Sequence, residues 1–76
     1  MPPKQFGYRE IAADLAERIA SGEYPAGTRL PSYRELAAMY SCSVTTAQFA
    51  IRILHPRGLT YGLPGRGIFV AGEADT

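Results

Sequence analysis

The segment 30–35, with the sequence LPSYRE, constrains the fold of this chain most, because it determines where a helix must begin. A residue that precedes proline is pushed out of the helical region of backbone space, so Leu30 is expected to be extended. Ser32 is a strong N-cap residue, and Glu35 three residues later completes a capping box that satisfies two backbone N–H groups. A helix is therefore predicted to begin directly after Ser32.

Two further helices are predicted, one on each side of this helix start. The first runs from Tyr8 to Ile19, where apolar residues recur at helical spacing, and Gly22 follows it as a terminator. The last is capped by Ser43, and Pro56 follows its end. The side chains expected to face the core are those of Tyr8, Ile11, Ala12, Leu15, Ala16, Ile19, Tyr33, Leu36, Ala37, Tyr40, Cys42, Val44, Ala47, Ala50, Ile51 and Leu54.

The residues from Leu59 to Ala71 predict a hairpin, because they alternate weakly around a glycine-rich centre at 62–67. The extended residues 29–31 could add a short strand. The fold class is thus expected to be mainly α with a small antiparallel β-hairpin or sheet, as in a winged helix-turn-helix of three helices plus a wing. One domain is expected at 8–72, between a flexible arm at 1–7 and a flexible tail at 73–76.

The composition excludes several classes of protein. With 76 residues, 46% of them hydrophobic and 20% charged, the chain is expected to be one small globular domain. No apolar run approaches the roughly 20 residues that span a bilayer, so a cytoplasmic protein without membrane contact is expected. Cys42 and His55 are too few for a zinc site within one chain. No carboxylate pair or nucleophile can be placed near His55, so neither an enzyme nor a cofactor is expected.

Positive charge is concentrated in the second half of the chain, although the net charge is only +1. The basic and acidic residues of 1–40 cancel. Residues 41–72 contain Arg52, Arg57 and Arg66 without any Asp or Glu, which leaves this segment with a charge of +3. An excess of this size favours an anionic partner only slightly by itself.

The predicted pair of adjacent helices points to double-stranded DNA as that partner. In a helix-turn-helix, one helix crosses the phosphate backbone while the next enters the major groove. The first turn of the helix after Ser32 offers free N–H groups and the positive end of the helix dipole to a phosphate. Tyr33 and Arg34 stand beside this anchor and are predicted contacts. The alternative for Arg34 is a surface arginine paired with a carboxylate.

The helix after Ser43 is predicted to enter the major groove with its first turns. Ser43, Thr45 and Thr46 suit phosphates or base edges, and Gln48 suits bidentate pairing with adenine. Arg52, two turns into the helix, is expected to meet a phosphate. The alternative is that Ser43 serves only as a cap and that the threonines are ordinary surface residues.

The hairpin tip is predicted to approach the minor groove. Arg66 lies between Gly65 and Gly67, and two glycines allow a backbone to come close to a narrow groove. The alternative is a solvated turn.

Together these residues resemble the N-terminal winged helix-turn-helix domain of the GntR family of bacterial transcriptional regulators. The resemblance covers nearly the whole chain. Its matching elements are Tyr8 to Ile19, Gly22, Tyr24-Pro25-Ala26-Gly27, Leu30-Pro31-Ser32, Arg34, Leu36-Ala37, Ser43, Thr45-Thr46, Ala50, Leu54, Gly58-Leu59, Gly65-Arg66-Gly67 and Phe69-Val70. It implies operator binding by a dimer on a pseudo-palindromic site, transcriptional repression, and DNA contacts from Arg34, Ser43, Thr45, Thr46 and the wing glycines.

The sequence departs from the family pattern at two pairs of positions. Val44 and Gln48 stand where the family usually carries arginine, so the base preference is expected to differ. Phe49 and Ile53 form an apolar i, i+4 pair where the family is usually polar. This pair either enlarges the core or forms a contact surface. The alternative function is therefore a winged-helix module for protein association or homodimerisation through Phe49 and Ile53.

The chain stops just after the wing, whereas typical family members continue into a domain that binds a small effector. No effector site is expected within these 76 residues. A fragment of a longer regulator and a standalone short member are equally compatible with the sequence.

Overall fold

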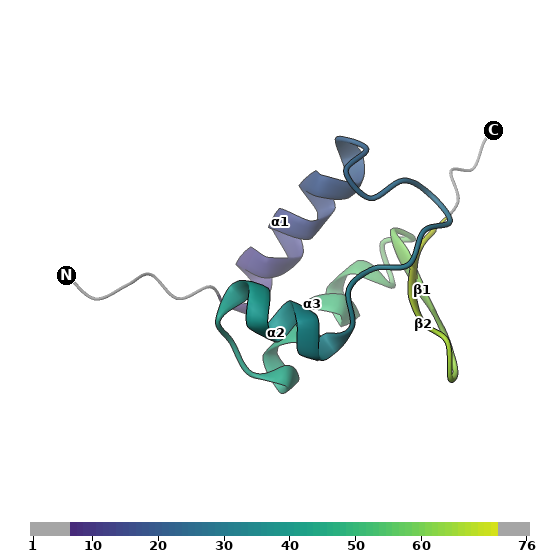
Figure 1. The fold of residues 1–76 in the computed structure, drawn as a ribbon. Helices are drawn as coiled ribbons and strands as arrows, with labels where there is room; N and C mark the ends of the chain where they lie inside the picture. Colours follow the sequence, from purple (N-terminus) through teal and green to yellow (C-terminus); the bar gives the residue numbers. More distant parts are fainter. Residues whose placement is uncertain (1–6, 72–76) are drawn as a thin grey trace.

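The computed structural model describes residues 7–71, and Figure 1 shows three helices followed by a hairpin. The elements in chain order are α1 (Tyr8–Ala20), α2 (Tyr33–Tyr40), α3 (Val44–Leu54), β1 (Thr60–Leu63) and β2 (Gly67–Val70). This order confirms the predicted fold class. Three parts of the predicted organisation lie outside the described residues: residues 1–6 of the arm, residue 72 of the domain, and the tail at 73–76.

The core lies where α3 packs against both α1 and α2. Each helix contributes one apolar stripe, and the loop before α2 and strand β2 close the core from the hairpin side. The buried hydrophobic side chains are those of Ile11, Ala12, Leu15, Leu30, Leu36, Tyr40, Ala47, Ala50, Ile51, Leu54, Ile68 and Val70. The helical spacing thus predicted most of the core correctly.

Two expected core residues are exposed instead. Tyr8 and Val44 are 40% and 39% exposed, respectively. Each is the first residue of its helix, where the neighbouring helices no longer cover the apolar stripe. Tyr8 turns its ring toward that of Phe49, with 5.7 Å between ring centroids. Cys42 is only partly buried, although it does pack against the core.

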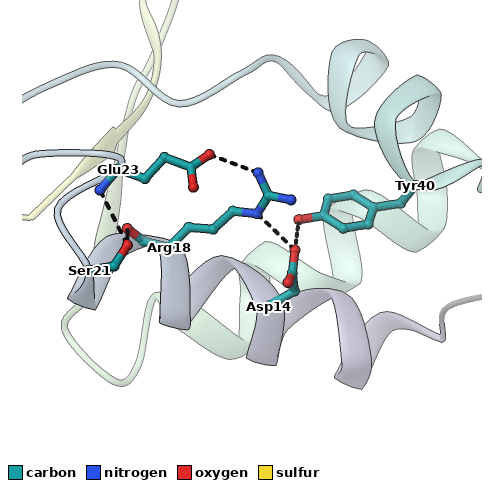
Figure 2. A network of polar contacts seen from close by, with 5 residues as sticks. All are labelled: Asp14, Arg18, Ser21, Glu23 and Tyr40. Carbon is teal, nitrogen blue, oxygen red and sulfur yellow. Dashed lines mark hydrogen bonds and ion pairs between the residues drawn. The ribbon is translucent and has the colours of Figure 1, made fainter.

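A polar network fastens α1 to the end of α2 and to the loop that follows α1 (Figure 2). Tyr40 donates its hydroxyl hydrogen to the carboxylate of Asp14. Arg18 donates from Nε to the same carboxylate at 2.9 Å and from Nη1 to Glu23 at 2.8 Å. The hydrogen bond from Tyr40, helped by Arg18, lowers the pKa of Asp14, while burial and the carboxylate raise the pKa of Tyr40. The network therefore sets how α2 sits on α1.

The turn between α2 and α3 is short and strongly specified. Ser41 adopts a left-handed conformation with φ 52°, which ends α2, and the N–H of Cys42 returns to the carbonyl of Ala37 at 2.9 Å. Ser43 then caps α3, because its hydroxyl oxygen accepts a hydrogen bond from the N–H of Thr46 at 3.0 Å. This turn fixes the angle between the two helices.

The hairpin pairs β1 with β2 in antiparallel register, from Thr60 opposite Val70 to Leu63 opposite Gly67. The extended segment before α2 joins the hairpin as expected, but only through an isolated bridge between Arg29 and Phe69 rather than through a full strand. Its hydrogen bonds include the N–H of Leu30 to the carbonyl of Ile68 at 2.8 Å. The hairpin is thereby held beside the beginning of α2.

Candidate nucleic-acid interface

The beginning of α2 carries the predicted capping box. The N–H of Ser32 donates to the carboxylate of Glu35 at 2.7 Å, and the hydroxyl oxygen of Ser32 accepts from the N–H of Glu35 at 3.1 Å. The backbone hydrogen bond from Ser32, followed by the hydrogen bond from its side chain, lowers the pKa of Glu35, because both favour the charged carboxylate. The N–H groups of Tyr33 and Arg34 in the first turn remain available to a phosphate. The cap and the predicted anchor can therefore coexist.

Arg34 and Tyr33 flank this helix start. Arg34 is exposed, and among residues 7–71 it forms no ion pair. The described residues therefore do not pair Arg34 with a carboxylate, as the alternative interpretation expected. Tyr33 is partly buried, packs against the core and also lines an open groove beside the hairpin.

The predicted contacts of α3 lie in and beside its first two turns. Ser43 both caps the helix and donates its hydroxyl hydrogen to the hydroxyl oxygen of Thr46 at 3.0 Å. This leaves the hydroxyl hydrogen of Thr46 free to donate outward. Thr45 is exposed, whereas Gln48 is partly buried. The start of α3 thus presents a row of small hydroxyl groups.

Arg52 is exposed and is held over a neighbouring ring rather than by a carboxylate. Its guanidinium lies 5.2 Å from the centroid of the Phe49 ring. A cation–π contact of this kind is worth roughly 0.5–1 kcal/mol at an exposed site. Phe49 itself is 42% exposed, whereas Ile53 is partly buried against the core. The apolar pair is therefore divided, with Ile53 enlarging the core and Phe49 facing solvent.

The tip of the hairpin is a tight turn built by proline and glycine. The N–H of Arg66 donates to the carbonyl of Leu63 at 2.9 Å, and Gly65 has φ 75°. Proline followed by a residue of positive φ is the pattern of a type II turn, which Pro64 and Gly65 satisfy. Arg66 is exposed immediately after this turn.

Arg29 is a candidate contact that the sequence interpretation did not single out. Gly67 has φ 122°, and a Cβ atom placed on it would lie 3.0 Å from Nε of Arg29. The glycine at 67 therefore makes room for an arginine from the segment before α2. Arg29, Tyr33 and the wing residues 62–68 line one open groove. The sequence offered one signal for this contact, a basic residue just before Leu30. The position of the Arg29 side chain, however, depends on the pairing of its segment with the hairpin.

The structure brings the starts of α2 and α3 and the turn of the hairpin to one side of the molecule. In Figure 1 all three lie toward the lower side of the view. Arg34 stands in the first turn of α2 and Arg66 in the turn of the hairpin, whereas Arg29 precedes α2 and Arg52 lies in the last turn of α3. Glu35, the acidic residue of α2, is engaged in the capping box.

Neither a metal-binding cluster nor a membrane-spanning helix occurs in the described part of the chain. Residues 7–71 contain no group of three His, Cys, Asp or Glu side chains that could hold a metal ion. None of their helices is long and apolar enough to cross a membrane. His55 hydrogen-bonds through Nδ1 to the hydroxyl group of Thr60, which joins the end of α3 to the hairpin.

The chain matches known proteins over nearly its whole length. The model of the family described as bacterial regulatory proteins, gntR family, matches residues 7–70. The HTH-type transcriptional regulator YdcR of Escherichia coli (strain K12) is 37% identical over 67 residues, which are 88% of this chain and 14% of that protein. The Exu regulon transcriptional regulator of the same organism is 40% identical over 63 residues, which are 83% of this chain and 24% of that protein.

Solved structures share the fold at similar identity. The DNA-binding domain of AraR in complex with operator ORX1 has a TM-score of 0.81 and 31% identity, covering 93% of this chain and 82% of that one. A GntR family transcriptional regulator from Listeria monocytogenes has a TM-score of 0.85 and 29% identity, covering 96% of this chain and 64% of that one. The chain spans only a small part of the curated relatives described above, but it matches the family over residues 7–70. It therefore belongs to the GntR family of bacterial regulatory proteins.

Proposed function

We propose that this chain is the DNA-binding module of a transcriptional regulator and that its partner is double-stranded operator DNA. The observation that carries the proposal is the likeness, over 93% of the chain, to a domain solved on an operator. Four exposed arginines, on α2, on α3, on the hairpin and in the segment before α2, support it, because protein–DNA affinity depends on cations that meet phosphates. Such a module acts in the cytoplasm, where bacterial operators are found.

Each part of the interface has a distinct role in this proposal. The first turn of α2, with Ser32, Tyr33 and Arg34, holds the phosphate backbone. The exposed face of α3 enters the major groove, where hydroxyl and amide side chains meet phosphates and bases. The wing residues Gly65, Arg66 and Gly67 approach the minor groove. The α3 contacts are Ser43, Thr45, Thr46, Gln48 and Arg52.

Selection of bound duplexes from a random pool, followed by titration at several salt concentrations, tests the proposal. The selected duplexes should share a sequence, and log affinity should fall with log salt by about 0.9 per phosphate contacted. Arg34→Ala should weaken binding and reduce the salt slope by about 0.9, which corresponds to the loss of one phosphate contact. An absence of duplex binding at low salt would refute the function.

The regulator is further proposed to bind a pseudo-palindromic operator as a dimer and to repress, since a protein on an operator excludes others from it. Half-sites about 10 base pairs apart, or a multiple of this, would support the dimer. In this proposal the chain contributes DNA binding and no effector site. A promoter fused to a reporter gene, with and without the regulator, distinguishes repression from activation.

A second candidate function is protein association, and the exposure of Phe49 favours it. A ring that is 42% exposed on a helix of this domain offers an apolar anchor to a partner surface. The two functions coexist if this anchor joins two copies of the chain on DNA.

A further inference from the structure

The first residue of α3 is an exposed aliphatic side chain that lies outside the hydrophobic core. Val44 is 39% exposed, although the helical spacing predicted it to be in the core. The side chain of Ser43 caps α3 directly before it, so the helix begins at a defined residue and the direction of the Val44 Cβ is defined with it. Valine in a helix has one strongly preferred χ1 rotamer. Its two methyl groups are therefore presented in a fixed position.

Valine has no hydrogen-bonding group, which limits what it can recognise on DNA. In the major groove the one apolar feature at a base edge is the C5 methyl group of thymine. Phosphates and the hydrogen-bonding groups of the base edges offer polar partners, which valine cannot use. The thymine methyl group is therefore the partner in that groove that best suits an exposed valine at the start of a helix.

Gln48 restricts where that thymine lies. Residues four apart share one face of a helix, so Gln48 follows Val44 one turn later. They are separated by about 6 Å along the helix axis. Base pairs rise about 3.4 Å each, so two bases met by these side chains lie no more than about two base pairs apart. Because glutamine pairs with the edge of adenine, the two side chains together select a thymine close to an adenine.

We infer that Val44 contacts the C5 methyl group of a thymine and makes this chain prefer thymine at one position of each half-site. The inference rests on the proposed function, because it requires α3 to lie in the major groove. It adds Val44 as a residue that determines operator specificity, beside the polar side chains of the same helix.

Replacement of thymine by uracil tests the inference, because it deletes the methyl group and keeps every hydrogen-bonding group of the base. The starting duplex is the one that the whole 76-residue chain selects from a random pool. Each thymine is replaced singly, and affinity is measured for the unchanged protein and for Val44→Ala. Alanine is a better helix former than valine, so this variant is expected to keep α3.

The unchanged protein should bind about fourfold more weakly when one particular thymine of a half-site becomes uracil, which corresponds to about 0.8 kcal/mol for one buried methyl group. Val44→Ala, which keeps only the Cβ methyl group, should show a much smaller difference between the thymine and uracil duplexes at that position. Met39→Ala, which truncates a 45% exposed side chain of α2, should retain the fourfold difference.

Two results would overturn the inference while leaving the function intact. One is equal binding by the unchanged protein at every thymine-to-uracil position. The other is a methyl effect that stays fourfold in Val44→Ala, which would assign the contact to a neighbour such as Thr45. Failure to select any duplex is a different result, because it removes the proposed function and the inference together.

Discussion

The hydroxyl group of Tyr40, at the end of α2, donates a hydrogen bond to the carboxylate of Asp14, in the middle of α1 (Figure 2). Tyr40 is only 6% exposed, and a hydroxyl group in a buried side chain needs hydrogen bonding such as this. Arg18 donates to the same carboxylate and links it to Glu23. The contact bears on the proposed function, in which α2 must keep its angle to α3 and α1 while its first turn meets the DNA backbone.

Tyr40→Phe is expected to lower the free energy of unfolding by about 1 kcal/mol at pH 7. Hydrogen bonds to charged groups are worth roughly 1.5–3 kcal/mol, and the exposure of Asp14 and Arg18 to solvent reduces that contribution. Urea unfolding measures the difference. Tyr61→Phe, on an exposed tyrosine of the wing, is the matched control and should leave stability unchanged.

The same contact has a defined pH dependence. The pKa of Asp14 is lower in the folded chain than its ordinary value, first because of the hydrogen bond from Tyr40 and then because of Arg18. A depressed folded pKa contributes stability above the unfolded pKa of about 4, and this contribution is lost as pH falls through the folded pKa. The gap between the unchanged chain and Tyr40→Phe should therefore shrink between pH 5 and 2. A gap of equal size at both ends would contradict the assignment.

Substitution of Ser43 separates its cap from its proposed DNA contact. Ser43→Ala removes the cap and should cost about 1 kcal/mol of stability. Ser43→Asp keeps a good N-cap, so the melting temperature should stay near that of the unchanged chain, while the added carboxylate repels phosphate and should abolish DNA binding. Thermal unfolding and duplex titration measure the two effects. Unchanged DNA binding by Ser43→Asp would place Ser43 away from the duplex.

Arg29→Ala is expected to weaken duplex binding and to reduce the salt slope by about 0.9, because one phosphate contact is lost. The guanidinium of Arg29 lies in the groove between α2 and the hairpin, where a backbone would pass. Arg57, an exposed arginine that follows the C-terminal end of α3, provides the matched control. Equal effects of Arg29→Ala and Arg57→Ala would indicate general charge attraction rather than a placed contact.

Gly67→Ala is expected to destabilise the hairpin by about 1–2 kcal/mol, because φ 122° is costly for any residue with a Cβ atom. The new methyl group would also press on Arg29. In an Arg29→Ala background this steric contact is absent, and only the cost of the backbone conformation remains. A double-mutant cycle of unfolding free energies should therefore give a non-zero coupling between positions 29 and 67. Gly65→Ala, with no atom near its Cβ position, should show the backbone cost without coupling to Arg29.

Phe49→Ser distinguishes the two candidate functions. The Phe49 ring contacts the Tyr8 ring and the Arg52 guanidinium without being buried, so its loss should cost the fold little. If Phe49 joins two copies, sedimentation should show a smaller particle for the variant than for the unchanged chain. If the ring serves only to hold Arg52, the particle size stays the same and duplex binding weakens modestly.

Local signals in the sequence were sufficient for the helices, their starts and the hairpin. The capping box of Ser32 and Glu35, the cap at Ser43 and the turn at Pro64 and Gly65 all involve residues within three positions of each other. Such interactions depend on short-range backbone geometry, which the order of residues determines directly. The apolar spacing likewise identified the inner face of each helix.

The tertiary structure alone decided which positions are covered and which distant residues meet. Periodicity assigns a face to a helix, but it does not say where the neighbouring helices stop, and so Tyr8 and Val44 were wrongly expected in the core. The approach of Arg29 to Gly67 depends on pairing between segments about 40 residues apart, which no local pattern specifies. The sequence by itself therefore determined the elements of a winged helix, whereas packing decided which side chains remain exposed at its interface.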